Sequence, residues 1–375
     1  MTEIFLIRHT QAEGNLYRMM QGHWDGDITP MGSRQIDALA ERFRNVPVDA
    51  VYSSDLYRAR MTAGAITRYH NLPLNTSKEL REVNVGPWET AFFGNVMHEF
   101  PEQAENFMAH PDKWRIDGAE TYAQVQKRAF AELSAIAQRH DGQSVAVVSH
   151  GVTIRCILAA VMDTGLDRLG EVPIVNNTSV TVLRYENGVF TPVVINDYSH
   201  LESIKSPEWK RNTALRDETI DPKEQKEYYC GCYADAWRAA HGCLTGFSAD
   251  GYILSAEEHW LYDSSSVLKM LDGDEPVGLI DMDVQRGAKD GTGWISLLYL
   301  NGNYRGKGYG IQLLARAIKK YTNLGRTELR LHVAEENAAA IKFYKNNGFE
   351  VIAEDEGVLG MQYLMRRKLG GRKYV

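Results

Sequence analysis

The hexapeptide Ile4-Phe5-Leu6-Ile7-Arg8-His9 decides the fold of the first half of the chain. Its first four residues form a short, continuous, β-prone apolar run, which is typical of a strand buried on both faces of a parallel sheet. A second such run, SVAVV at 144–148, is followed by Ser149-His150-Gly151. Between them lie helical patterns, one after Thr29-Pro30 as N-cap and first helical residue and one at 122–139. Strands that alternate with helices predict an α/β domain with a mostly parallel sheet.

The length of the chain and one charged stretch predict two domains. The chain has 375 residues, whereas one hydrophobic core rarely grows beyond ~250–300 residues. Residues 201–227 are highly charged, contain two prolines and lack a sustained apolar face, so we place the linker there. We therefore expect one domain at 1–203 and a second at 204–375, and we find no internal repeat that relates them.

Composition narrows the class of protein. Hydrophobic residues make up 44% and charged residues 24% of the chain, as in ordinary soluble proteins. The net charge of −7 gives no basis for a nucleic-acid partner. No stretch approaches the ~18–20 apolar residues of a membrane span, and the first residues do not resemble a secretion signal. Four cysteines are too few for a disulfide framework. We therefore expect a cytoplasmic protein without a membrane partner.

The rest of the chain contains further strand and helix patterns. Runs at 178–185 and 189–195 predict a hairpin that turns at Asn187-Gly188. A helix is expected to start after Asp221-Pro222 and to stop at Gly242. The remaining expected strands are 277–284, 294–300, 328–333 and a pair within 349–368, and the remaining expected helices are 311–321 and 338–346.

Two histidines follow the two apolar strands of the first domain. Because ligands bind outside the carboxyl ends of strands in open α/β sheets, His9 and His150 are expected to converge on one pocket if their strands are neighbours. A neutral imidazole can attack phosphorus and form a phosphohistidine. Arginines bind phosphate oxygens through two parallel hydrogen bonds, and a carboxylic acid can protonate the leaving oxygen. Arg58 and Glu82 are suitable candidates for these two tasks.

Residues 1 to about 200 resemble the histidine phosphatase superfamily, which has a three-layer α/β/α fold like that of phosphoglycerate mutase. The resemblance implies His9 as nucleophile, Glu82 as acid and then base, and His150, Arg8 and Arg58 as phosphate ligands. It also implies that Asn15, Gln21 and Gly22 bind the phosphate or the substrate, and it implies no metal. The blocks that carry it are LIRHTQAEGN at 6–15, QG at 21–22 with ITPMG at 28–32, SSDLYRARMTA at 53–63, LREVNVGPWE at 80–89 and VVSHG at 147–151.

The sequence departs from the family pattern at two positions. Thr10 stands where the family has glycine after Arg-His, and Thr90 stands where it has glycine after Trp-Glu. Neither change removes a chemical group from the expected site. The segment between Glu82 and His150 is short for a mutase, which favours a phosphatase, with a phosphoglycerate-type mutase as the alternative. The other histidines of this half are interpreted as surface or packing residues: His23, His70, His98, His110 and His140.

A glycine-rich turn follows the strand-like run at 294–300. Asn301-Gly302-Asn303 breaks the strand, and YRGKGYG at 304–310 leads into a helix. Free backbone N–H groups at a helix N-terminus bind anions, and glycines allow close approach of a ligand. The pattern predicts a pyrophosphate site. It is not a P-loop, because no serine or threonine follows Lys307.

Residues 206 to 372 resemble the GNAT N-acetyltransferase superfamily, an α+β fold that uses acetyl-CoA as co-substrate. The pattern Arg-x-x-Gly-x-Gly at 305–310 and the later Asn337 and Phe343-Tyr344 carry the resemblance. It implies that Tyr344 protonates the departing thiolate, which a phenol of pKa ~10 can do. The implied acetyl-CoA contacts are Leu298, Tyr299, Leu300, Arg305, Gly306, Lys307, Gly308, Tyr309, Gly310 and Asn337.

Other features of the second half leave alternatives open. The base for the acceptor amine is Glu257, Glu258, Asp281, Asp283 or a chain of water molecules. Aromatic residues between 228 and 262 line an acceptor pocket or form a helix core. Cys230, Cys232, His241 and Cys243 suggest zinc, but residues i and i+2 of a helix point apart, which favours ordinary thiols.

The sequence therefore predicts a bifunctional enzyme. Its first domain would hydrolyse a small-molecule phosphomonoester, and its second would acetylate the amine of a small molecule or peptide. An alternative is that the second domain binds acetyl-CoA as a sensor that regulates the phosphatase. Whether the chain forms a homo-oligomer is left open.

Overall fold

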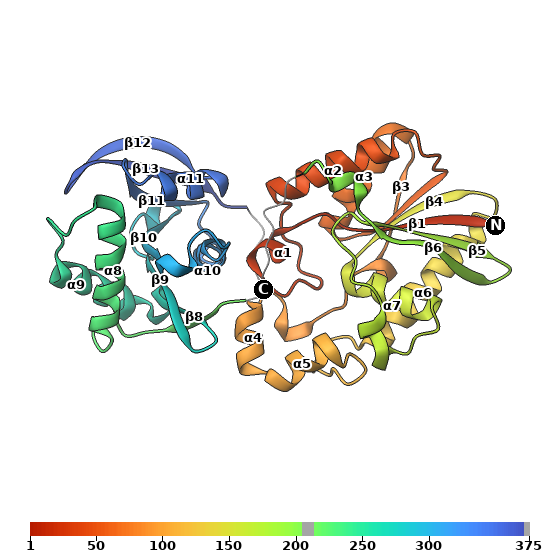
Figure 1. The fold of residues 1–375 in the computed structure, drawn as a ribbon, viewed down its shortest axis with the longest axis horizontal. Coiled ribbons are helices and arrows are strands. Elements are labelled where there is room, and N and C mark those ends of the chain that lie inside the picture. The colour runs from red at the N-terminus through yellow and green to blue at the C-terminus, as the bar shows by residue number, and fades with distance from the viewer. Residues whose placement is uncertain (205–213, 371–375) are drawn as a thin grey trace. The chain divides into compact units, whose positions relative to one another are not determined.

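The computed structural model describes residues 1–204 and 214–370, and it forms two compact units (Figure 1). The first contains residues 1–91 and 96–204, and the second contains residues 92–95 and 214–370. The central part of the expected linker, 205–213, lies outside the described residues. Within the described part, no helix is both long and apolar enough to cross a membrane.

The first unit is built on a six-stranded sheet of order β3-β2-β4-β1-β5-β6. The first four strands in this order are mutually parallel, and β5 and β6 close the sheet as an antiparallel hairpin. This arrangement confirms the predicted α/β domain. The strands are β1 (Thr2–Arg8), β2 (Ala50–Ser54), β3 (Leu74–Ser77), β4 (Ser144–Ser149), β5 (Val180–Glu186) and β6 (Val189–Asp197).

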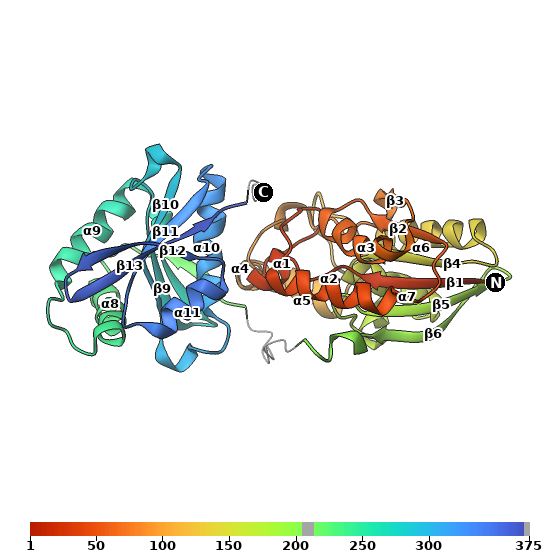
Figure 2. The same cartoon turned by 90° about the horizontal axis from the view of Figure 1, so that it is seen from above.

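Helices cover both faces of this sheet and complete three layers. Figures 1 and 2 show α2 and α3 on one face and α6 and α7 on the other. The helices of the unit are α1 (Glu13–Tyr17), α2 (Pro30–Phe43), α3 (Tyr57–His70), α5 (Pro101–Ala109), α6 (Tyr122–Arg139) and α7 (Gly151–Val161), together with residues 96–99 of α4 (Phe93–Glu99).

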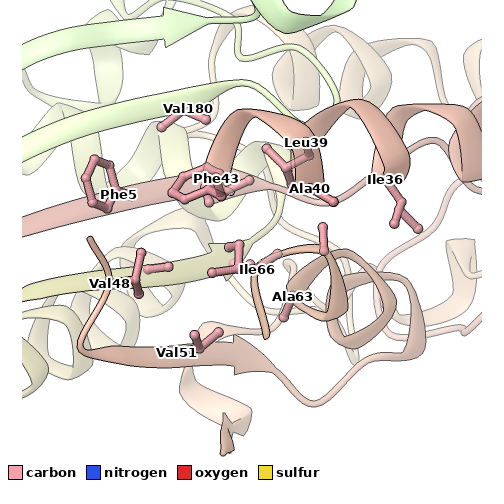
Figure 3. Packing of buried hydrophobic residues seen from close by; sticks show 14 of the residues in the cluster. Phe5, Ile36, Leu39, Ala40, Phe43, Val48, Val51, Ala63, Ile66 and Val180 are labelled. Atoms are coloured by element: carbon pink, nitrogen blue, oxygen red, sulfur yellow. The ribbon is translucent and has the colours of Figure 1, made fainter. Parts of the chain in front are cut away.

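The core between α2, α3 and the sheet is shown in Figure 3. Leu39 and Phe43 of α2 and Ile66 of α3 are almost completely buried against the strands. The ring of Phe43 meets that of Phe5 edge-on, with centroids 5.4 Å apart. Burial of such side chains stabilises the domain by about 1.5–3 kcal/mol each and holds the strands that carry the two histidines.

Local sequence signals explain where several elements begin and end. Thr29 caps α2 by accepting a hydrogen bond from the Gly32 amide at 3.0 Å. Helix α6 spans the predicted residues and begins at a capping box of Thr121 and Gln124. The predicted hairpin turn has two left-handed residues, with φ of 50° at Asn187 and 85° at Gly188.

The second unit contains a seven-stranded sheet of order β12-β13-β11-β10-β9-β8-β7. All neighbours are antiparallel except β10 and β11. Figure 2 shows α8 and α9 on one face of this sheet and α10 and α11 on the other. The elements are β7 (Arg216–Thr219), α8 (Lys226–His241), α9 (Ala249–Tyr262), β8 (Val267–Asp272), β9 (Glu275–Asp283), β10 (Thr292–Leu300), α10 (Gly310–Asn323), β11 (Glu328–Ala334), α11 (Ala338–Asn346), β12 (Glu350–Gly357) and β13 (Gly360–Lys368).

The predicted start of α8 is wrong, although its end at Gly242 is confirmed. The Asp221 carboxylate accepts hydrogen bonds from the amides of Lys223 (2.8 Å) and Glu224 (3.3 Å), which forms a separate turn. The helix therefore begins only at Lys226. The predicted hairpin strand also begins later, at Val180, because Thr178 has a left-handed φ of 56° that a strand cannot contain.

Candidate active sites

His9 and His150 meet at the carboxyl ends of two neighbouring strands. Strands β1 and β4 are parallel and pair in a register that places Arg8 opposite Ser149. The residue that directly follows each strand is a histidine, and the two ring centroids are 5.0 Å apart. His9 is 3% exposed and His150 is fully buried. The predicted convergence of the two imidazoles is therefore present.

A backbone carbonyl fixes the tautomer of His9. Nδ1 lies 2.6 Å from the carbonyl oxygen of Thr10, which can only accept, so Nδ1 carries the proton. Nε2 then keeps a lone pair, which a nucleophile needs. Burial, together with the charges of Arg58 and Arg8, holds the pKa of His9 well below its ordinary value. The ring is therefore neutral at neutral pH.

The buried Arg58, the half-buried Arg8 and the buried His150 present polar atoms that lack protein partners. Arg58 donates to the carbonyls of Trp24 (2.9 Å) and Gly22 (2.7 Å), and Arg8 donates to the carbonyl of Val175 (2.6 Å). Among the described residues, the Nε atoms of both arginines and both ring nitrogens of His150 have no hydrogen-bond partner. Burial lowers the pKa of Arg58 to about 10, which still leaves it charged at neutral pH. Buried donors without partners are costly, and a bound phosphate would satisfy them.

The Glu82 side chain lies at the N-terminus of α7, the helix that begins directly after His150. Its carboxylate accepts hydrogen bonds from the amides of Val83, Val152 and Thr153 and from the Thr153 hydroxyl, at 3.1–3.2 Å. The side chain is 8% exposed. The structure therefore brings the candidate acid to the same strand end as the candidate nucleophile.

The other predicted residues of this site differ in whether their polar atoms already have hydrogen-bond partners in the protein. The Asn15 side chain accepts from the Ala12 amide at 3.0 Å and so caps α1. The carbonyl of Gly22 accepts from Arg58. The side-chain amide of Gln21 is buried, and neither its nitrogen nor its oxygen has a partner among the described residues. Of these three, Gln21 has the polar atoms that a substrate could use.

Three supporting residues were not recognised in the sequence. The Asn177 amide donates to the carbonyl of His9 at 2.8 Å. The Glu89 carboxylate accepts the amides of 22, 23 and 24, which fixes the loop that holds Arg58. His23, expected to be a surface or packing residue, hydrogen-bonds through Nε2 to the Glu82 carbonyl at 2.9 Å. Only the position of Glu89, the last residue of the block 80–89 that contains Glu82, was a sequence signal for these roles.

In the second unit, two parallel strands separate at the expected acetyl-CoA site. Strands β10 and β11 pair only through Thr292, Gly293 and Trp294 of β10. Beyond this point β11 pairs with β13 alone, and β10 pairs with β9 across a bulge between Ile295 and Leu297. The rest of β10, which contains Leu298, Tyr299 and Leu300, therefore presents a backbone edge toward β11 without a ladder.

The glycine-rich turn leads from this edge to the N-terminus of α10. Gly306 and Gly308 have φ of 70° and 83°, which only glycine adopts readily. A Cβ added at Gly306 would meet no atom within 4 Å, whereas one at Gly310 would lie 3.1 Å from the ring of Phe343. The side chain of Arg305 is already engaged, since it donates to the Leu300 carbonyl at 2.7 Å and pairs with Asp235 at 3.3 Å. Anion binding at this turn would therefore depend on backbone amides and on the exposed Lys307 rather than on Arg305.

Tyr344 lies in α11, and Asn337 is the residue that caps its N-terminus. Burial raises the pKa of Tyr344 well above its ordinary value, so the residue stays a phenol. The side chain is 8% exposed and packs against Phe343 and Phe349. Asn337 caps α11 by accepting from the Ala340 amide at 3.1 Å. This bond gives Asn337 a structural role in addition to the predicted one.

The candidate bases differ in how far they are engaged. Asp281 is 1% exposed, and its two oxygens accept from Tyr229 and His259, each at 2.7 Å. Asp283 pairs with the other nitrogen of His259 at 3.4 Å. These two carboxylates tie α8 and α9 to β9. Within the part of the chain that is described, no three His, Cys, Asp or Glu side chains are arranged to hold a metal ion.

Comparison with known proteins assigns the class of the first unit. The model of the histidine phosphatase superfamily (branch 1) matches residues 4–198, more than half of the chain. The chain therefore belongs to this superfamily. The model of the acetyltransferase (GNAT) family matches residues 224–349, so the same chain also carries a GNAT domain.

Individual relatives match the first half. Phosphoserine phosphatase 1 of Hydrogenobacter thermophilus is 29% identical over 201 residues, which cover 54% of this chain and 95% of that protein. Phosphoglycerate mutase-like protein 4 of Arabidopsis thaliana is 31% identical over 204 residues, 53% of this chain and 87% of that protein. The structure of Bacillus stearothermophilus YhfR superimposes with a TM-score of 0.53 and 32% identity, covering 54% of this chain and all of the other.

Proposed function

We propose that the N-terminal domain hydrolyses small phosphomonoesters through a phosphohistidine at His9. The supporting observation is the hydrogen bond from Nδ1 to the Thr10 carbonyl, beside arginine and His150 atoms without partners. Nε2 of His9 attacks phosphorus, and the bond from phosphorus to the ester oxygen breaks. Glu82 acts as the general acid that supplies a proton to that oxygen. Water then attacks the phosphohistidine, Glu82 takes a proton from it, and His9 leaves as neutral imidazole.

The test of this mechanism is a trapping experiment with a matched histidine control. Wild type, His9→Gln and His110→Gln are mixed with ³²P-labelled aryl phosphate and quenched, and the labelled protein is treated with acid or alkali. His110 is exposed. We expect acid-labile, alkali-stable label on wild type and His110→Gln, and neither label nor turnover on His9→Gln. Full activity in His9→Gln would eliminate the phosphohistidine.

The relatives suggest which substrates to compare first. One carries the name of a phosphoserine phosphatase and another that of a phosphoglycerate mutase-like protein. We infer hydrolysis rather than isomerisation, because the segment between Glu82 and His150 is short. Phosphoserine and 3-phosphoglycerate should release inorganic phosphate. Rapid interconversion of 2- and 3-phosphoglycerate without phosphate release would instead establish a mutase.

We also propose that the C-terminal domain transfers acetyl from acetyl-CoA to an amine of a small molecule or peptide. The separation of β10 from β11 supports this, because the β10 edge offers backbone groups to the amides of the pantetheine arm. The turn at 305–310 offers amides to the pyrophosphate. The amine nitrogen bonds to the acetyl carbon and loses its proton to one of the candidate bases or to water, and the carbon–sulfur bond breaks. The Tyr344 phenol protonates the thiolate and then regains a proton from solvent.

Thiol release with a panel of amines tests this second activity. Tyr344→Phe should lower kcat by about 10²-fold with little change in KM for acetyl-CoA, while Tyr262→Phe, at an exposed tyrosine, should behave as wild type. Each domain should keep its activity when the other is inactivated by His9→Gln or Tyr344→Phe. Tight binding of acetyl-CoA by calorimetry without turnover of any amine would favour the sensor.

A further inference from the structure

The backbone of residues 79–82, which leads into Glu82, is held by side chains at every carbonyl. Four consecutive carbonyl oxygens accept hydrogen bonds from side chains that lie elsewhere in the first unit. Any movement of a carbonyl group in this segment would therefore stretch or break a hydrogen bond. The bonds are Arg128 to 79 (2.7 Å), 81 (2.9 Å) and 82 (2.9 Å), Ser149 to 80 (2.8 Å), Thr153 to 81 (2.8 Å) and His23 to 82 (2.9 Å).

Arg128 of α6 makes three of these six hydrogen bonds. Its guanidinium is itself fixed by Glu120, with Nε to Oε1 at 2.8 Å and Nη2 to Oε2 at 2.9 Å. The Glu120 carboxylate also accepts the Asn84 amide at 2.9 Å. Arg128 is 15% and Glu120 24% exposed, so water competes little for these bonds. Burial opposes the charge on Glu120, but Arg128 and the Asn84 amide outweigh it and lower its pKa, which keeps the pair ionised.

The carboxylate of Glu82 is fixed at its other end by the first turn of α7. Main chain and side chain are thus both held, and the Thr153 hydroxyl bonds to each, whereas Arg128 bonds only to the main chain of this segment. We propose that Arg128, oriented by Glu120, is a positioning residue for proton donation by Glu82. This inference rests on the proposed phosphatase mechanism. The same side chain places Glu82 for both of its steps, since the residue first gives and then takes a proton.

A positioning role for the acid has a chemical signature that general destabilisation lacks. Proton donation matters when the leaving oxygen is strongly basic, as in an alkyl phosphate, and matters little for a weakly basic dinitrophenolate. A misplaced Glu82 should therefore slow the release of alkoxides selectively. The ratio kcat/KM isolates this step, because it reports events up to phosphorylation of His9 and excludes the later attack of water.

The experiment compares 2,4-dinitrophenyl phosphate with an alkyl phosphate in the full chain. In Arg128→Met, kcat/KM for the alkyl ester should fall about 10²-fold, near the lower end of general acid contributions, and change less than about 3-fold for the dinitrophenyl ester. Glu120→Gln should show the same pattern more weakly, and Arg128→Lys should recover part of the loss. The control is Arg155→Met, because Arg155 also binds two carbonyls, but those of Leu169 and Val172 rather than those of residues 79–82.

The outcomes separate this inference from the phosphatase proposal. Equal losses on both esters in Arg128→Met, or the same selectivity in Arg155→Met, would overturn the positioning role. Unchanged activity on both esters in a folded Arg128→Met would also overturn it. Failure of the phosphohistidine itself would appear elsewhere, as persistent turnover in His9→Gln. Phosphoenzyme formed by Arg128→Met from the dinitrophenyl ester shows that the variant still folds around a working nucleophile.

Discussion

The buried ion pair of the acetyltransferase domain predicts a strong pH dependence of its stability. His259 of α9 contacts Asp281 at 2.7 Å and Asp283 at 3.4 Å. Burial alone would lower the pKa of His259, but hydrogen bonds to the two carboxylates outweigh it and raise the pKa to about 10. A raised pKa contributes stability that is complete below the unfolded value of about 6.5 and is lost as pH rises toward 10.

The magnitude follows from the two pKa values. Each tenfold change in proton affinity corresponds to about 1.4 kcal/mol, so the full effect approaches 5 kcal/mol between pH 6.5 and 10. We expect the free energy of unfolding of this domain to be nearly flat below pH 6 and to fall by about 1.4 kcal/mol per pH unit above 7. His259→Gln removes the titrating group, so its stability should be lower at pH 6 and should converge with that of wild type near pH 10.

The experiment is a series of urea titrations from pH 6 to 10 in which unfolding is monitored by hydrogen exchange of peptides from α9 and β9. These peptides report the free energy of unfolding of this domain separately from that of the phosphatase domain. His332→Gln is the matched control, because His332 also pairs with an aspartate, Asp355 at 2.9 Å, but is 27% exposed. Such partly exposed pairs contribute about 0–1 kcal/mol. A wild-type stability that stays constant from pH 6.5 to 9 would show that His259 is neutral in the fold and would refute the reasoning.

Three further predictions concern both domains. Asn177→Ala removes the donor to the His9 carbonyl, and the loss of such a hydrogen bond costs about 1 kcal/mol. The single-turnover rate of phosphoenzyme formation should therefore fall several-fold, and an unchanged rate would contradict a positioning role for this amide. Gly308→Ala places a side chain at a φ of 83°, which costs about 1–2 kcal/mol. Calorimetry should therefore show about 10-fold weaker binding of acetyl-CoA, and equal affinity would mean that the turn does not contact the ligand. Leu39→Ala in the fully buried core of α2 should lower the unfolding free energy of the phosphatase domain by about 2–5 kcal/mol, and a loss below 1 kcal/mol in urea titration would mean that the core collapses around the gap.

The sequence predicted those elements whose own residues determine them. The centre of strand β1, residues 4–7, is continuously apolar because it is buried on both faces, and α6 carries both a cap and a helical apolar period. Helix α9 was not predicted, because Leu254 and Leu261 are exposed on it and blur its apolar face. The start of α8 was placed wrongly because the Asp221 carboxylate serves a turn rather than a helix cap, and both uses have the same sequence signature.

The candidate phosphatase site likewise contains residues whose place could be predicted from the sequence and others, such as Arg128, whose place could not. His9 and His150 could be placed together because strand ends in a parallel sheet meet at one edge. Arg128 could not be linked to Glu82, because the two are 46 residues apart and the hydrogen bonds reach main-chain carbonyls, which have no sequence signature. Every residue has a main-chain carbonyl, whatever its side chain. The residue type at the accepting position therefore does not indicate such a hydrogen bond, and only the folded chain reveals it.

The Thr10 carbonyl that orients His9 has a consequence for how this site tolerates change. Because the acceptor is a peptide oxygen, no single side-chain substitution can remove it, and the imidazole keeps its protonation pattern whatever residue occupies position 10. The threonine there uses its hydroxyl elsewhere, on the carbonyl of Gly32 at 2.6 Å. Mutational robustness of the reacting nitrogen is therefore a property of the peptide bond, whereas the Thr10 side chain serves the packing of its own buried surroundings.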